Sequence, residues 1–196
     1  MEGFNNDLQT QMKQLEKIVM SNKILGDILK KANTIGLKNY YVGAGCVTQT
    51  VWNYQMNYEL TNGISDIDFV YYDNSDLSFE AEKIIIEHIK KEFMQCQIKL
   101  DIKNQARVHL WYKDHFGYDI KPYSSIEDAI NSWETTATAI GIKLENEIFK
   151  LYAPFGLNDL FNMIFRANKT QITEEIYSQK AQKWKAKWPT LTVIPW

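Results

Sequence analysis

The segment from Tyr40 to Asp73 constrains the fold of this chain most, because its pattern predicts a strand, a glycine turn, a helix and a second strand. The turn is Gly43-Ala44-Gly45, and glycines permit tight turns and close approach of a ligand to the backbone. The helix predicted over 46–58 presents free N–H groups and the positive end of its dipole at this turn. A phosphate group could therefore bind at the start of the helix.

The second predicted strand carries two carboxylates on one face. Asp66 and Asp68 flank Ile67, and residues two apart in a strand share a face. Two like charges this close repel each other unless a divalent cation lies between them, and hard oxygen ligands suit magnesium. Each signal alone has a simpler explanation, since a GxG turn is often only a turn and an Asp-Ile-Asp strand end is often solvated. In this order they predict a combined phosphate and metal site.

The composition excludes several classes of protein. A net charge of −2 argues against broad electrostatic binding to nucleic acid. Cys46 and Cys96 belong to no CxxC or Cys/His cluster, which argues against a disulfide framework or a zinc site. The sequence has no recognisable signal peptide and no apolar run long enough to span a bilayer. We therefore expect a cytoplasmic protein with no membrane partner.

The rest of the chain predicts helices packed around a sheet. Apolar spacing favours one domain over 1–196, with N-terminal helices at 1–36, a sheet core at 37–152 and C-terminal helices at 153–196. The predicted elements are helices over 7–31 with a break at Ser21-Asn22, a strand at 38–42, a strand at 66–72, helices at 79–93, 124–133, 157–165 and 173–187, a loop at 114–122, and a hairpin of 140–144 with 147–151.

A further segment, 97–111, predicts a strand with one polar face. If the segment is extended, the residues that share this face are Asp101, Lys103, Gln105, Arg107 and His109. Such a face is often simply exposed to water. This one begins with an aspartate between two apolar residues, which makes Asp101 the carboxylate of this segment to consider for a site.

The last predicted helix combines lysines with tryptophans. Its side chains of these types, with the residue that follows it, are Lys180, Lys183, Lys185, Lys187, Trp184 and Trp188. A basic and aromatic surface can bind nucleic acid. We favour the simpler interpretation, a solvated lysine face with the tryptophans packed inward.

The glycine turn, the helix start and the Asp-x-Asp strand together resemble the nucleotidyltransferase superfamily of the DNA polymerase beta type. The chain is also similar to a narrower bacterial nucleotidyltransferase-like family of small proteins. The matching pieces are VGAGCVTQTVWN at 42–53, SDIDFVYYD at 65–73, KNQARVHLWY at 103–112, TATAIGIKL at 136–144, APFGLNDLFNMIFRAN at 153–168 and KAKWPTL at 185–191.

The resemblance implies an α/β (α+β) fold with a twisted mixed sheet and flanking helices. It implies transfer of a nucleoside monophosphate from a nucleoside triphosphate to an acceptor, which could be a small molecule, a protein or RNA. Asp66 and Asp68 would bind two Mg2+ (or Mn2+) ions. Asp101 would be the third carboxylate, because the superfamily places one on a strand neighbouring the Asp-x-Asp strand.

The chain departs from the superfamily at the phosphate turn. Many members carry a serine whose hydroxyl contacts phosphate, whereas here Cys46 follows Gly45. Phosphate contact would rest on backbone N–H groups of Gly43, Ala44 and Gly45 and on Thr48. The residues of 103–107 supply further candidates, which are Lys103 and Arg107 for phosphate charge and Asn104 and Gln105 for sugar or base.

Two other functions remain open. The missing hydroxyl favours a module of the same fold that binds a nucleotide without transferring it. An antitoxin-like interaction protein is a third interpretation, and the acidic triad counts against it because such a protein would have no use for one.

Overall fold

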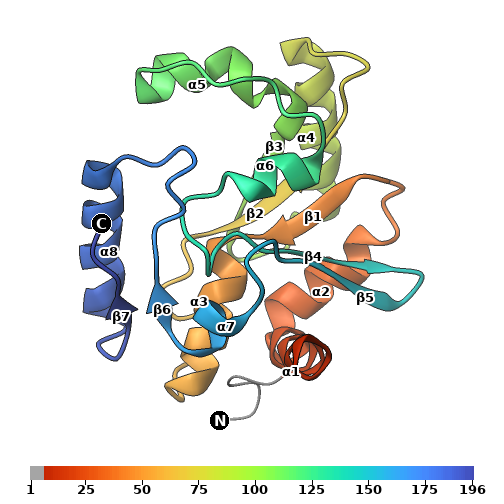
Figure 1. The fold of residues 1–196 in the computed structure, drawn as a ribbon. Coiled ribbons are helices and arrows are strands. Elements are labelled where there is room, and N and C mark those ends of the chain that lie inside the picture. Colours follow the sequence, from red (N-terminus) through yellow and green to blue (C-terminus); the bar gives the residue numbers. More distant parts are fainter. Residues whose placement is uncertain (1–6) are drawn as a thin grey trace.

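The computed structural model describes residues 7–196 and centres on one five-stranded sheet with helices around it (Figure 1). The helices are α1 (Leu8–Ser21), α2 (Lys23–Ala32), α3 (Gly45–Gln55), α4 (Phe79–Glu92), α5 (Val108–Phe116), α6 (Ile126–Asn131), α7 (Asn158–Phe161) and α8 (Glu174–Lys187), with a 3-10 turn, η1 (Gln105–Arg107). The strands are β1 (Tyr40–Gly43), β2 (Asp66–Tyr71), β3 (Lys99–Asn104), β4 (Gly141–Glu145), β5 (Ile148–Tyr152), β6 (Ile164–Phe165) and β7 (Thr192–Val193). Within this described range no helix is long and apolar enough to cross a membrane.

The sheet is mixed, with the strand order β3-β2-β1-β4-β5. β1 lies antiparallel to both β2 and β4, and β4 and β5 form an antiparallel hairpin. β2 and β3 are parallel, and α4 is the crossover between them, as a parallel pair requires. The expected α/β fold with a mixed sheet and flanking helices is confirmed.

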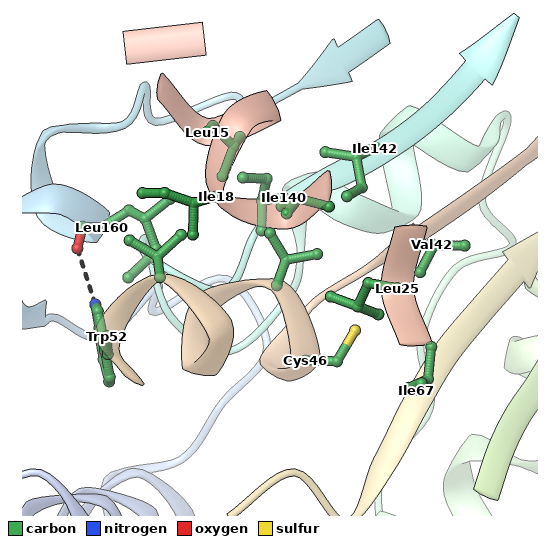
Figure 2. Close-up of a cluster of buried hydrophobic side chains, with 14 of the residues drawn as sticks. Leu15, Ile18, Leu25, Val42, Cys46, Trp52, Ile67, Ile140, Ile142 and Leu160 are labelled. Atoms are coloured by element: carbon green, nitrogen blue, oxygen red, sulfur yellow. Dashed lines mark hydrogen bonds between the residues drawn. The ribbon is translucent and has the colours of Figure 1, made fainter. Parts of the chain in front are cut away.

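One face of the sheet is covered by the main apolar core. Alternate residues of the strands, such as Val42, Ile67 and Ile142, point to this face and pack against α1, α2 and α3 (Figure 2). Trp52 of α3 is fully buried, and its Nε1 donates a hydrogen bond of 2.8 Å to the carbonyl of Leu160. The opposite face carries a smaller apolar cluster under α6. The aspartates of β2 point to this second face, because they alternate along the strand with the buried Ile67.

The C-terminal helix is attached to α3 through aromatic side chains. Trp184 and Trp188 are 6% and 0% exposed and stack edge-on or tilted against Trp52 and each other. Trp188 Nε1 donates to Oδ1 of Asn53 at 2.9 Å in a buried environment. The prediction that these tryptophans pack inward is confirmed.

Several predicted element boundaries are confirmed by their caps. The N-terminal helices break at Asn22, whose side chain accepts a hydrogen bond from the backbone N–H of Leu25. Ser78 caps α4 and Thr173 caps α8 through the same kind of bond. The cap of α6 is one residue later than predicted, because Ser125 accepts from Asp128 N–H while the Asp128 carboxylate accepts from Ser124 N–H.

The predicted strand over 97–111 is wrong beyond Asn104. The Asn104 side chain accepts a hydrogen bond from the backbone N–H of Ala106, which turns the chain into η1 and then α5. Gln105, Arg107 and His109 therefore do not continue the polar face of β3. The loop predicted from 114 also begins too early, since α5 continues to Phe116 and ends at a left-handed glycine.

The predicted helix over 157–165 is also largely wrong. Only the four residues of α7 are helical. Met163 then adopts a positive φ of 52°, and the chain enters β6, which pairs with β7 near the C-terminus. Pairing with β7, in which Thr192 lies opposite Ile164, decides this local structure.

Candidate active site

A cavity of about 450 Å3 opens on the second face of the sheet and is lined by residues of α5 and α8. Its floor is formed by the ends of β2 and β3 and by the first turn of α3. Its lining includes an acidic group, Asp66, Asp68 and Asp101, and an aromatic group from segment 111–123. The volume lies within the range of small-molecule and cofactor sites.

The pairing of three neighbouring strands brings the carboxylates together. Asp68 of β2 lies opposite Asp101 of β3 in the parallel register, and opposite Gly43 of β1 on its other side. Asp66 shares the face of Asp68 because it lies two residues earlier. The three predicted carboxylates therefore line one cavity beside the glycine turn.

The electrostatics of the acidic group are dominated by Asp68. The pKa of its carboxyl is raised to about 7, with burial as the largest cause and the charges of Asp101 and Asp66 acting in the same direction, while Lys103 and Lys180 act in the opposite direction. The Lys103 ammonium lies 2.5 Å from Oδ2 of Asp101. Negative charge is thus concentrated here and only partly neutralised by the chain itself.

The glycine turn is held in a shape that few residues allow. A Cβ added to Gly43 would lie 2.2 Å from the carbonyl oxygen of Ile140, so only glycine fits between β1 and β4. Ala44 has φ 56° and ψ −134°, a conformation that favours glycine. No side chain caps the start of α3 at this turn. The N–H of Ala44 donates to the carbonyl of Ile140 at 2.9 Å, so the N–H groups without helical partners are those of the first turn of α3, where Gly45 lines the cavity.

Four predicted binding residues do not line the cavity. The first is Gly43, which lies at the end of β1 between β2 and β4. Thr48 is fully buried and its hydroxyl lies 2.8 Å from the carbonyl of Ala137, so it bonds to the backbone instead of facing a ligand. Arg107 forms an ion pair with Glu82 and donates through Nε to the carbonyl of Leu77, because η1 turns it away from β3.

Asn104 is the fourth of these residues. It is 2% exposed, and its side-chain amide donates to the carbonyl of Asp73 at 2.7 Å and accepts from the N–H of the same residue. Of the predicted group at 103–107, only Lys103 and Gln105 line the cavity.

Sequence reasoning missed Gln49, which lies one helical turn after Gly45 and lines the cavity. It is 9% exposed, and its Oε1 is buried without a hydrogen-bond partner among residues 7–196. A buried acceptor without a partner is unfavourable by about 1–3 kcal/mol, which marks a place where a bound donor would be welcome. The i to i+4 spacing from Gly45 was the available signal.

The other missed residues come from segments remote from the motifs. An ion pair of Lys180 on α8 with Glu134 lines the cavity. The aromatic group consists of Trp111, Tyr112, Phe116, Tyr118 and Tyr123. Their segment, which reads partly as strand and partly as loop, gave no signal because a helix at α5 was not expected.

The donor set suits a hard divalent cation, although it is not arranged as a finished site. Among the described residues no group of three or more His, Cys, Asp or Glu side chains is positioned to hold a metal ion. Asp66, Asp68 and Asp101 nevertheless supply the carboxylate oxygens that Mg2+ and Mn2+ prefer. The Lys103 ammonium now neutralises one of them. The residues thus fit such a cation by their chemistry, with Asp101 as the ligand that must change its partner.

Comparisons with known proteins agree with this geometry. A family model described as a nucleotidyltransferase matches residues 30–193. A solved structure is 26% identical with a TM-score of 0.73, and the alignment covers 92% of this chain and 96% of that one. That structure is described as an NMR structure that reveals a CCA-adding enzyme head domain. No curated protein matches the sequence.

Proposed function

Because this chain belongs to the nucleotidyltransferase family whose model matches residues 30–193, we propose that it transfers a nucleoside monophosphate from a nucleoside triphosphate to an acceptor hydroxyl. The observation that supports this most is the strand register of Asp68 with Asp101 and with Gly43. It brings an acidic group and a glycine turn to one cavity. Those two features are what the transfer of a charged phosphoryl group requires.

The residues around the cavity divide naturally between the parts of a nucleotide. The triphosphate would bind at the start of α3, where backbone N–H groups and the helix dipole attract anions. Lys103 would neutralise phosphate charge. Gln105 and Gln49 would contact sugar or base, and the rings of the aromatic group would contact the flat face of a base.

Mg2+ or Mn2+ would be held by Asp66, Asp68 and Asp101. When bound, such ions neutralise the charge of the triphosphate and stabilise the attacking and leaving oxygens of an in-line displacement.

The proposed transfer has a simple balance of bonds. The acceptor oxygen forms a bond to the α-phosphorus while the bond from that phosphorus to the bridging oxygen breaks, and pyrophosphate leaves. The proton of the acceptor hydroxyl passes to Asp101 or to water. The contribution of the protein is mainly positioning and charge neutralisation.

Transfer can be tested with each of the four ribonucleoside triphosphates labelled at the α-phosphate. The protein is incubated with magnesium and three acceptor pools: small metabolites, proteins, and RNA with free 3′ hydroxyls. RNA is included because the structurally similar protein is described as a CCA-adding head domain. We expect label in one pool with the wild type and none with Asp68→Asn. Equal labelling by both proteins would contradict the proposed site.

A binding module of the same fold is the second candidate, and the turn itself favours it. Cys46 replaces the usual serine, and its Sγ lies 3.0 Å from the carbonyl oxygen of Gly43 in the buried interior. A protein that binds a triphosphate tightly but labels no pool would support this alternative.

A further inference from the structure

Lys103 pairs with the third carboxylate of the site and also lines the cavity. It lies two residues after Asp101 on the same face of β3, and its ammonium bonds to the Asp101 carboxylate at 2.5 Å. The two side chains are 38% and 30% exposed and both line the cavity. A cation supplied by the chain therefore already lies beside the third carboxylate.

A triphosphate bound at the proposed phosphate turn would come close to the same ammonium. Gly43, Asp68 and Asp101 lie on three neighbouring strands in direct register. Neighbouring strands are about 4.8 Å apart, which separates the turn from Asp101 by about 10 Å. A triphosphate bound at the turn would extend into this interval, and the flexible four-carbon stem of a lysine lets its ammonium move toward it.

The other lysine that acts on Asp68 is held differently. Lys180 also lowers the pKa of Asp68, but its ammonium is paired with Glu134 and it comes from α8. Its partner is not one of the three carboxylates of the acidic group. Lys180 thus provides a matched control, with the same charge in the same cavity and a different ion pair.

We propose that Lys103 couples metal binding to nucleotide binding, because its ion pair with Asp101 must open before either ligand can bind fully. This inference rests on the proposed function. A divalent cation needs the Asp101 carboxylate released from Lys103. Triphosphate oxygens attract the Lys103 ammonium away from Asp101. Binding of either ligand therefore opens the ion pair, and the second ligand then binds without the cost of opening it.

The test measures binding alone. The affinity of Mn2+ is determined without nucleotide, and the affinity of each α,β-methylene nucleoside triphosphate analogue is determined in chelator and in Mn2+. The ratio of the last two affinities is the coupling factor. The affinity of Mn2+ for the free analogue is the same for every variant and cancels when variants are compared.

Lys103→Met should bind Mn2+ alone about tenfold more tightly than the wild type, and its coupling factor should fall about tenfold. Lys180→Met should keep the wild-type coupling factor, because it leaves the Lys103–Asp101 pair intact. Lys103→Arg should retain most of the coupling, because it keeps a charge that can exchange between the two partners. Thermal melts check that each variant is folded.

Three results would overturn the inference: Lys103→Met binding Mn2+ alone no more tightly than the wild type, Lys180→Met changing the coupling factor as much as Lys103→Met, or a wild type that binds the two ligands independently. If the two ligands bind with the expected coupling but no acceptor is labelled, the proposed transfer reaction is contradicted and the coupling by Lys103 is not.

Discussion

Asp68 combines a partly buried carboxyl with two like charges, and this has a consequence for stability. Its pKa is raised to about 7, first by burial and then by Asp101 and Asp66. A carboxyl whose folded pKa lies above its unfolded value binds its proton more tightly in the folded state. The stability it contributes is therefore complete below about pH 4 and is lost as the pH rises through about 7.

We expect the metal-free protein to be less stable at pH 8 than at pH 5.5. Asp68→Asn should remove most of this difference and should raise the free energy of unfolding at pH 8 by about 2 kcal/mol. Urea unfolding in chelator measures both. Asp27→Asn, at an exposed position on α2, controls for loss of a surface carboxylate and should leave the difference in place. A wild type equally stable at the two pH values would contradict the assignment of the raised pKa.

Ala44 shows strain of a different kind at the same site. Its φ of 56° brings the Cβ of an L-residue close to its own backbone. Ala44→Gly should raise the free energy of unfolding by about 0.5–1 kcal/mol, the relief of strain exceeding the extra entropy of the unfolded chain.

Ala181→Gly, in the middle of α8, should lower the free energy of unfolding by about 1 kcal/mol. Denaturant titration of both variants gives the two signs. A loss of stability in Ala44→Gly would show that the turn is relaxed with alanine.

Among the elements, β1 is the one whose end depends most on glycine. Gly43→Ala would place a Cβ 2.2 Å from the Ile140 carbonyl oxygen, and both groups belong to the backbone. The strand pair must move apart, so we expect the free energy of unfolding to fall by about 3 kcal/mol.

Gly45→Ala provides the matched comparison. Its Cβ would meet the flexible end of Gln49 at 3.1 Å, and the fold should lose less than about 1 kcal/mol. Urea unfolding distinguishes the two glycines. Equal losses of unfolding free energy in the two variants would mean that β1 and β4 can move apart at little cost to accommodate the new Cβ.

The elements also show what the sequence could and could not predict. β2 and α3 follow local periodicity, and so the two aspartates and the glycine turn were found from their spacing. The end of β3 depends on Asn104, which bonds to the backbone of Asp73, a residue 31 positions away. Arg107 is drawn to Glu82 on α4 for the same long-range reason. Contacts between residues so far apart in the sequence cannot be predicted from the pattern of neighbouring residues.

At the scale of the whole molecule, one buried tryptophan connects the C-terminal region to the centre. Trp188 is fully buried and bonds to Asn53 of α3. α8, which ends one residue earlier, supplies Lys180, Lys183 and Trp184 to the cavity wall. The packing of the C-terminal helix and the shape of the cavity are therefore linked.

Trp188→Phe should lower the free energy of unfolding by about 2–3 kcal/mol, because it leaves Oδ1 of Asn53 unpaired and a small void beside it. Trp196→Phe, at a position 38% exposed, should change it by less than about 0.5 kcal/mol. Differential scanning calorimetry compares the two. Similar melting temperatures for both variants would show that the buried hydrogen bond contributes little.

The parallel register of β2 and β3 sets a rule for how this gene product can tolerate change. A strand alternates its side chains with a period of two. Deletion of one residue within β3 that shifts this register would place Leu100 or Ile102 where Asp101 now faces the cavity. A point substitution in β3 keeps this register. A single-codon insertion or deletion in β3 would replace the acidic side chain that faces the cavity with an apolar one. The number of residues in β3 should therefore tolerate less change than the identity of most of its residues.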